Sequence, residues 1–330
     1  MPPIRPGSRV FVAGHRGLVG SAVVRRLADE PVEVLTRTRD ELDLRDGAAV
    51  RAFFEAEEPT HLVLAAAKVG GILANATYPA DFVRDNLAIE LATLGAAHDA
   101  GLGQRGRIVF LGSSCIYPRQ APQPMREEHL LTGPLEPTNR PYAIAKIAGI
   151  ELAESFHRQS GDDTVSLMPT NLYGPGDNFD LETSHVLPAL IRRFDESRGA
   201  GPGGADAPVT LWGSGAPRRE FLYADDLADA VAHVLALPQD RIRGAAPDGL
   251  LNVGVGEDLS IKELGELVRD VVGATGEVRW DASKPDGTPR KLLDVSRMAS
   301  LGWTATTPLR SGIEMATAWY RDHTATPADA

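Results

Sequence analysis

Tyr142 and Lys146 stand four residues apart in the segment Tyr-Ala-Ile-Ala-Lys. If this segment is helical, both side chains leave the same face, one turn apart. A free tyrosine has a pKa of about 10 and is a poor acid or base at neutral pH. A nearby ammonium favours the phenolate, so we expect Lys146 to lower the pKa of Tyr142 toward the working range. Such a pair could move a proton to or from a sugar or alcohol oxygen while a hydride moves at its carbon.

A second set of polar side chains follows an apolar run at residues 108–111, which is typical of a buried strand. Ser113 and Ser114 come just after this run, and one of their hydroxyls could hold a carbonyl oxygen against the phenol. Cys115 is the only cysteine of the chain, which excludes an internal disulfide and a cysteine-based metal cluster. Taken alone, a lone cysteine is most often a small buried hydrophobe, and an i,i+4 Tyr/Lys pair is most often an ordinary surface pair. The motif at the start of the chain, described next, favours a catalytic role for these residues over an ordinary structural one.

A strand, a glycine loop and a helix are predicted one after another near the N-terminus. The buried run at residues 10–13 leads into Gly14, Gly17 and Gly20, and a helical pattern covers residues 21–28. This unit places a pyrophosphate at a helix N-terminus, where free amides and the helix dipole favour an anion. The spacing is Gly-x-x-Gly-x-x-Gly, and a glycine trio alone also fits a tight turn with close helix packing.

The second predicted strand, residues 32–35, indicates which dinucleotide is bound. It ends in Thr-Arg-Thr-Arg, with Arg37 and Arg39, where an NAD site would be expected to offer a carboxylate. Arginines accommodate a 2′-phosphate, and Arg16 in the glycine loop adds another cation. We therefore expect NADP(H), although Asp40 and Glu41 argue in the other direction.

Composition narrows the class of protein. A chain of 330 residues can bury one large α/β unit or two domains. The net charge of −11 argues against a general nucleic-acid or anionic-membrane binder, but it allows an anionic small ligand held by local arginines. No run approaches the roughly 18 apolar residues of a membrane span, and the first residues lack the apolar core of a signal peptide. The expected location is cytoplasmic.

The order of elements predicts an α/β fold, a Rossmann-type doubly wound parallel sheet with a smaller discontinuous C-terminal substrate domain. Residues 1–173 and 221–256 are assigned to the cofactor domain, and residues 174–220 and 257–330 to the substrate domain. Further strands are expected at residues 61–67, 165–168, 221–223 and 251–254, and long helices at residues 81–100 and 142–156. A helix at residues 185–194 is expected to break near Pro188, residues 197–208 to form a flexible excursion, and Ser260 to cap a helix with Glu263.

The sequence resembles the extended short-chain dehydrogenase/reductase family, and within it the NADP-dependent epimerase-reductases of GDP-4-keto-6-deoxymannose. The resemblance covers nearly the whole chain. The glycine loop and the Tyr/Lys pair mark only the superfamily, whereas the Ser-Ser-Cys and Asp281–Gly287 segments are narrower. The matching segments are residues 14–20, 65–72, 112–118, 141–146, 169–175, 212–215 and 281–287.

This resemblance implies three steps on one nucleotide sugar. A ketone at carbon 4 acidifies the protons at carbons 3 and 5, an acid/base pair inverts both centres, and NADPH delivers hydride to carbon 4 to give GDP-L-fucose. By position, Cys115 and His185 match the epimerising pair, Tyr142 the proton donor and Lys146 its modulator. Ser113 and Ser114 match positions near the keto oxygen. A homodimer is implied, and no metal is expected.

The resemblance also assigns binding positions. The nucleotide-sugar end is matched by Arg193, Trp212, Arg219, Asp281 and Lys284. The residues expected to contact NADP(H) are Gly14, His15, Arg16, Gly17, Leu18, Val19, Gly20, Arg39, Leu111, Gly112, Ser113, Ser114, Lys146, Pro169, Thr170, Asn171, Leu172 and His185.

Several alternatives stay open at this point. Without the resemblance, His185 would be an ordinary histidine, Trp212 a core residue and the Arg218-Arg219 pair a solvated surface pair. Another nucleotide-sugar epimerase, reductase or dehydratase could share the fold, but a dehydratase would be expected to hold carboxylates where Ser114 and Cys115 stand. A non-catalytic NADP-sensing protein would be expected to lack the Tyr/Lys pair.

Overall fold

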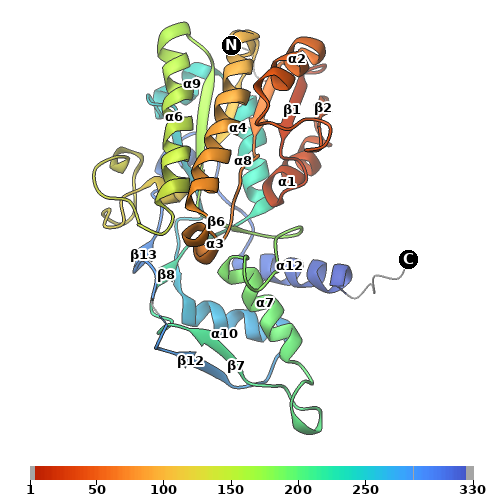
Figure 1. Ribbon diagram of the computed structural model, residues 1–330, viewed down its shortest axis with the longest axis vertical. Helices are drawn as coiled ribbons and strands as arrows, with labels where there is room; N and C mark the ends of the chain where they lie inside the picture. The colour runs from red at the N-terminus through yellow and green to blue at the C-terminus, as the bar shows by residue number, and fades with distance from the viewer. Residues whose placement is uncertain (1–3, 285, 325–330) are drawn as a thin grey trace.

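Six parallel strands form the central sheet of the computed structural model, which describes residues 4–284 and 286–324 (Figure 1). The strand order is β10-β5-β4-β3-β1-β2, and all neighbours run parallel. After β1 the chain goes to the edge strand β2 and then returns to β3 on the other side of β1. The carboxyl ends of β1 and β3 therefore border the switch point where open α/β sheets bind ligands. The strands are β1 (Arg9–Ala13), β2 (Glu33–Leu35), β3 (His61–Leu64), β4 (Ile108–Leu111), β5 (Thr164–Pro169) and β10 (Leu250–Val253).

Alternate residues of these strands enter two separate cores. In β1, for example, Val10 and Val12 pack with the helices α1 (Leu18–Leu27) and α8 (Ala224–Ala236), whereas Phe11 packs on the opposite face. The opposite face is covered by α2 (Gly47–Glu57), α4 (Pro79–Asp99) and α6 (Arg140–Ser160). This period-2 burial on both faces confirms the predicted doubly wound sheet.

The lower part of the molecule in Figure 1 has its own apolar core. Here β7 (Val209–Trp212) pairs in parallel with β12 (Val278–Asp281), and α7 (Val186–Ser197), α10 (Ile261–Val272) and α12 (Leu309–Thr324) pack around them. A three-stranded sheet of β8 (Arg218–Arg219), β11 (Leu259–Ser260) and β13 (Arg290–Lys291) lies near the junction with the upper part. The remaining elements are α3 (Ile72–Thr77), α5 (Leu102–Arg105), α9 (Gln239–Ala245), α11 (Ser296–Ser300), β6 (Asn171–Tyr173), β9 (Phe221–Tyr223) and three 3₁₀ turns, η1 (Ser114–Ile116), η2 (Glu127–His129) and η3 (Pro202–Gly204).

Three local predictions concern the cap of α10, the start of α7 and the strand β9. The capping box of Ser260 and Glu263 is confirmed at the start of α10. The expected break near Pro188 is wrong, because α7 begins at Val186 and a proline in the first helical turn displaces no intrahelical hydrogen bond. The strand at residues 221–223 exists as β9, but it pairs only with β6 and does not join the central sheet.

Glu220 joins the two parts of the molecule. Its buried carboxylate accepts hydrogen bonds from the backbone amides of Val255 and Gly256, both at 2.7 Å, and of Leu293 at 3.0 Å. Its own carbonyl accepts from the side chain of Asn171 at 2.8 Å. One residue between β8 and β9 thus fixes the chain beyond β10, the chain beyond β13 and the start of β6.

Across the described ranges, no helix combines the length and the apolar character that crossing a membrane requires.

Candidate functional site

The glycine loop brings two backbone segments into direct contact. Gly14 has a φ of +90°, and a Cβ on it would lie 2.7 Å from the backbone of Ala66, just beyond β3. A Cβ on Gly20 would lie 2.1 Å from the carbonyl oxygen of Gly14. Only glycine allows both approaches, which leave the N-terminus of α1 facing the switch point. The adjacent His15 has a buried Nδ1 without a hydrogen-bond partner, so this cradle fits a dinucleotide pyrophosphate.

The three predicted arginines differ in whether their guanidinium groups are already held by a carboxylate of the protein. Arg37 makes a 2.5 Å ion pair with Glu57 and stacks on Phe53 at 5.2 Å. Arg16 is exposed, and 72% of the Arg39 side chain is exposed with only a 3.8 Å contact to Asp43. Arg16 and Arg39 are therefore the cations available to a 2′-phosphate, while Arg37 serves the local packing.

Tyr142 and Lys146 lie on one face of α6, as predicted. The Lys146 ammonium lies 5.9 Å from the centre of the Tyr142 ring and 4.7 Å from that of Phe110. However, the expectation that Lys146 lowers the pKa of Tyr142 is wrong for this structure. Burial raises the pKa of Tyr142 well above its usual value, and Cys115 and Glu90 raise it further.

Glu90, which sequence reasoning missed, explains part of this difference. It lies on α4, and its Oε1 is 3.2 Å from the Lys146 Nζ in a pair that is almost fully buried. The carboxylate offsets the ammonium charge that would otherwise favour the phenolate. The only sequence signal for a role of Glu90 is that a glutamate lies among the buried positions of a helix. Its partner Lys146 becomes evident only when α4 packs against α6.

Ser113, Ser114 and Cys115 begin the η1 turn directly beyond β4. The Ser113 hydroxyl caps this turn by accepting from the Cys115 amide at 3.3 Å, and the Cys115 side chain is buried. Burial raises the pKa of the Cys115 thiol, while the charges of Lys291 and Lys146 act in the opposite direction. Lys291, on β13, is a second residue that sequence reasoning missed, and burial lowers its own pKa.

His185 immediately precedes α7 and comes from the other part of the molecule. The amide of Gly71, in the loop beyond β3, donates to the carbonyl of Thr183 at 3.1 Å, which ties the His185 segment to the central sheet. Asn86 fixes the same loop by exchanging hydrogen bonds with the backbone of Lys68 at 2.8 and 3.0 Å. Within the described residues, no hydrogen bond joins His185 to Cys115 or Tyr142.

The other predicted cofactor positions gather where β4 and β5 end, at the same edge of the sheet as the glycine loop. Gly112 leaves room for Met168, which a Cβ would meet at 2.2 Å. The hydroxyl of Thr170 donates to the Glu220 carbonyl at 3.3 Å. The remaining positions at this edge are Leu111, Ser114, Pro169, Asn171 and Leu172; Leu18 and Val19 lie in the first turn of α1.

The predicted nucleotide-sugar residues lie on elements of the lower part of the molecule. Trp212 is 65% exposed, and the Lys284 ammonium lies 5.3 Å from its ring. Asp281 stands opposite Trp212 in the β7–β12 register and holds the Ser283 amide and hydroxyl at 3.0 and 2.6 Å. Pro285, part of the Asp281–Gly287 motif, lies outside the described residues.

Neighbouring arginines on β8 have different environments. Arg218 pairs with Asp258 at 2.8 Å, whereas half-buried Arg219 has no carboxylate partner among the described residues. Burial lowers the pKa of Arg219, and Gly287 lies beside its guanidinium. Arg193 on α7 likewise lacks an ion pair with any described residue. Arg219 and Arg193 can therefore receive an anionic ligand.

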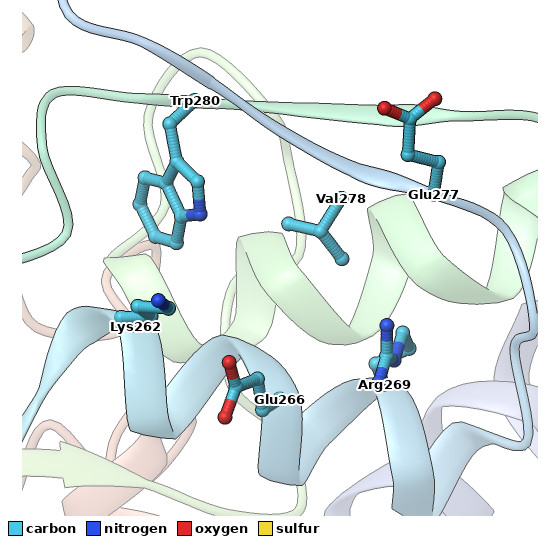
Figure 2. A pocket seen from close by; sticks show the side chains of 6 residues that line it. All are labelled: Lys262, Glu266, Arg269, Glu277, Val278 and Trp280. Atoms are coloured by element: carbon cyan, nitrogen blue, oxygen red, sulfur yellow. The ribbon is translucent and has the colours of Figure 1, made fainter.

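A pocket of about 370 Å³ lies between α10 and β12, away from these residues (Figure 2). Lys262, Glu266 and Arg269 reach it from α10, and Trp280 reaches it from β12. None of the predicted site residues lines it. Trp280 also fills the space beside Gly215, so this face of β12 supports the loop that follows Trp212.

Comparison with known proteins identifies the family. The model of the NAD dependent epimerase/dehydratase family matches residues 10–254. The chain belongs to this family. It is 53% identical over 319 residues to a GDP-L-fucose synthase of Escherichia coli K12, covering 96% of this chain and 97% of that one. The identity to GDP-L-fucose synthase 1 of Arabidopsis thaliana is 52%, covering 95% and 93% of the two chains.

A solved structure gives the same result at the level of the fold. The GDP-L-fucose synthetase of Naegleria fowleri bound to NADP superposes with a TM-score of 0.86 at 28% identity, covering 99% of this chain and 97% of that one. These relatives confirm the predicted resemblance and the predicted class, an NAD(P)-dependent enzyme of nucleotide-sugar metabolism.

The close packing of the glycine loop gives a direct test. In a Gly20→Ala variant the added Cβ must displace the Gly14 backbone, so we expect a loss of about 1–3 kcal/mol of stability and at least about tenfold weaker dinucleotide binding. Thermal unfolding and fluorescence titration with a reduced nicotinamide dinucleotide measure the two effects.

Gly17→Ala is the matched control for stability, because its Cβ would meet the Gly14 carbonyl oxygen at an ordinary contact distance of 3.5 Å and its φ of −78° suits alanine. A Gly20→Ala protein as stable and as tightly binding as the parent would contradict the assignment of the cradle.

Proposed function

We propose that this protein catalyses the NADPH-dependent epimerisation of GDP-4-keto-6-deoxymannose at carbons 3 and 5 and its reduction at carbon 4, which yields GDP-L-fucose. The observation that carries the proposal is that the proposed proton donor of the reduction, Tyr142, and the proposed epimerising thiol, Cys115, lie in one cluster with Lys146. Cys115 raises the pKa of Tyr142, and Lys146 lowers that of Cys115, so the three side chains lie within reach of one another's charge. The relatives named GDP-L-fucose synthase supply the identity of the substrate.

Reduction uses Tyr142, Lys146 and Ser113. NADPH, when bound, supplies the hydride that reduces carbon 4. Tyr142 donates its proton to the carbon 4 oxygen, and its raised pKa keeps the phenol protonated before this step. The Lys146 ammonium lies 5.9 Å from the ring and, together with Glu90, sets the charge beside the phenol during this step. The Ser113 hydroxyl, beyond the end of β4, holds the carbonyl oxygen toward Tyr142.

Epimerisation uses Cys115 and His185. The carbon 4 ketone makes the protons at carbons 3 and 5 acidic, so a base can remove one from one face while an acid returns one to the other. Each inversion consumes no net proton. A free thiol and a free imidazole titrate close enough to neutrality to share this work, and burial lowers the pKa of the His185 imidazole here. Lys291 and Lys146 oppose the effect of burial on the Cys115 thiol and so favour the thiolate that acts as a base.

The nucleotide diphosphate is assigned to the cations of the lower part of the molecule. Arg219 and Arg193 have no carboxylate partner in the part of the chain that the structure describes. Trp212 offers an exposed ring, and Lys284 adds a charge beside it. An acidic protein must supply such cations locally. In this proposal the sheet-bearing part is the cofactor domain and the part around β7 and β12 is the substrate domain.

A dehydratase is the second candidate on this fold. Loss of water from the sugar needs a general acid and base beside the serine, and here those positions hold Ser114 and Cys115 in place of carboxylates. The buried Glu90 faces Lys146. The residues present therefore favour epimerisation and reduction.

Turnover of the proposed substrate tests the function. Purified protein mixed with NADPH and GDP-4-keto-6-deoxymannose should oxidise the nicotinamide, seen as a loss of its absorbance, and should form GDP-L-fucose. The same mixture with GDP-mannose, which has no ketone, is the control. Absence of NADPH oxidation by folded protein would eliminate the proposal.

The exposed arginines test the preference for NADPH. Arg39→Met and Arg16→Met should raise the KM for NADPH by about tenfold per lost phosphate contact and change the KM for NADH little. Arg37→Met is the matched control, because its guanidinium is held by Glu57 and its loss should affect stability more than cofactor choice. Equal changes with both cofactors would show that Arg16 and Arg39 do not contact a 2′-phosphate.

The two arginines of β8 test the nucleotide-sugar site. Arg219→Met should raise the KM for the nucleotide sugar by about 10- to 100-fold with little change in unfolding temperature, since a charge-assisted contact contributes about 1.5–3 kcal/mol. Arg218→Met removes the pair with Asp258 and should lower the unfolding temperature instead. If the two variants behave alike, Arg219 does not bind the diphosphate.

We further propose that the enzyme is a homodimer that pairs through α4 and α6. These adjacent helices expose apolar side chains at Leu87, Leu91 and Ile144. Such a patch is costly on a monomer and is stabilised by a second copy. Leu91→Glu should yield monomers in sedimentation velocity, and a parent protein that is itself monomeric at micromolar concentration would contradict the proposal.

A further inference from the structure

Glu90 and Lys146 form an ion pair in the interior between α4 and α6. The Lys146 Nζ lies 3.2 Å from Oε1 of Glu90, and the exposed fractions of the two side chains are 2% and 3%. Neither carboxylate oxygen of Glu90 makes a hydrogen bond to any described residue, so Lys146 is its one polar contact there. The pair is thus shielded from the surface and forms no second ion pair with any described residue.

The surrounding residues are shaped to admit this carboxylate. A Cβ on Gly149 would lie 2.9 Å from Oε2 of Glu90 and 2.5 Å from the Phe110 ring, so only glycine at this place on α6 leaves room for both. The Phe110 ring lies 4.7 Å from the ammonium on another side. Lys146 is therefore held by Glu90, by the aromatic ring and by its own helix.

A buried ion pair of this kind is not expected to add to the free energy of unfolding. Burial of two charges costs several kcal/mol, and well-packed apolar residues are often as stable or more stable. A carboxylate at this place has a second effect, because it acts on the ammonium that faces Tyr142. The net charge beside the phenol is then close to zero.

We infer that Glu90 is the positioning residue of Lys146: it fixes the ammonium beside Tyr142 and cancels its charge, so that Tyr142 keeps the proton it must donate. The inference deepens the proposed function, because it rests on Tyr142 as the proton donor. Glu90 itself touches no reacting atom and acts through Lys146.

The sign of the effect follows from the titratable groups around Glu90. These are Lys146 and Tyr142 on α6 and Cys115 on η1. Burial raises the pKa of Glu90 to about 7, so above neutrality the carboxylate is ionised and raises the pKa of Tyr142. In Glu90→Gln the ammonium is no longer offset, and the phenolate should form about one pH unit lower than in the parent.

Ultraviolet titration of the phenolate measures this shift directly on the substrate-free protein. Subtracting the titration of each protein's Tyr142→Phe counterpart isolates the signal of Tyr142. The result expected is a phenolate that appears about one pH unit earlier in Glu90→Gln. Asp99→Asn is the matched control, since it removes one exposed carboxylate from the same helix and should leave the titration unchanged. An identical Tyr142 titration in parent and Glu90→Gln would overturn the inference.

A double variant separates the charge of the pair from its packing and remains testable should Glu90→Gln fail to fold. Glu90→Gln combined with Lys146→Met removes both buried charges, so the net charge beside Tyr142 is again zero. Its Tyr142 should titrate at the pH of the parent. If the double variant instead shows the earlier phenolate expected of Glu90→Gln, Glu90 does not act through Lys146.

The pH dependence of NADPH oxidation tests whether Glu90 affects catalysis. In Glu90→Gln the alkaline limb of the pH profile of NADPH oxidation should move down by the same amount, because the donor form of Tyr142 is lost earlier. An unmoved alkaline limb alongside a shifted phenolate would show that Glu90 does not control proton donation. If the parent enzyme does not turn over the keto sugar, the proposed function fails, while the titrations still decide the role of Glu90.

Discussion

The buried carboxylate of Glu220 is the interaction on which the arrangement of the site depends. Its two oxygens accept three backbone amides from Val255, Gly256 and Leu293, which belong to segments far apart in the sequence. A Cβ on Gly254 would lie only 2.2 Å from this carboxylate, so the end of β10 is fitted closely around it. The part that carries Arg219 is thereby held against the edge of the sheet that carries the glycine loop. A cofactor and a nucleotide sugar can then meet across one junction.

A second constraint is the burial of charge near the reacting groups. Tyr142, Lys146, Glu90 and Cys115 share an apolar environment, and the pKa of the phenol, the thiol and the carboxyl are all raised by that burial. Each group therefore depends on its neighbours for its protonation state. In the proposed function, this coupling lets one small site provide a protonated donor for reduction and a thiol that can lose its proton for epimerisation.

The sequence was sufficient for the strands of the central sheet and for several local elements near the candidate site, because these are encoded by local patterns. The strand before Gly14, the i,i+4 spacing of Tyr142 and Lys146 and the capping box at Ser260 each require only neighbouring residues. Glu90 and Lys291 were missed because their importance comes from contacts between elements distant in the sequence. The pKa of Tyr142 was predicted in the wrong direction because its burial, the largest cause of the rise, and the nearby Cys115 and Glu90 all depend on tertiary packing; Glu90 lies 56 residues from Lys146 along the chain.

The central claim is that separate side chains of one site carry out epimerisation and reduction, and hydrogen exchange tests it most directly. The keto sugar is incubated in heavy water with Cys115→Ser or Tyr142→Phe, and deuterium at carbons 3 and 5 is followed by NMR. Tyr142→Phe should lose reduction by a factor of about 10² to 10⁴ but continue to exchange both positions, whereas Cys115→Ser should stop the exchange with its fold and NADPH binding preserved. Exchange at the parental rate by Cys115→Ser would contradict the account.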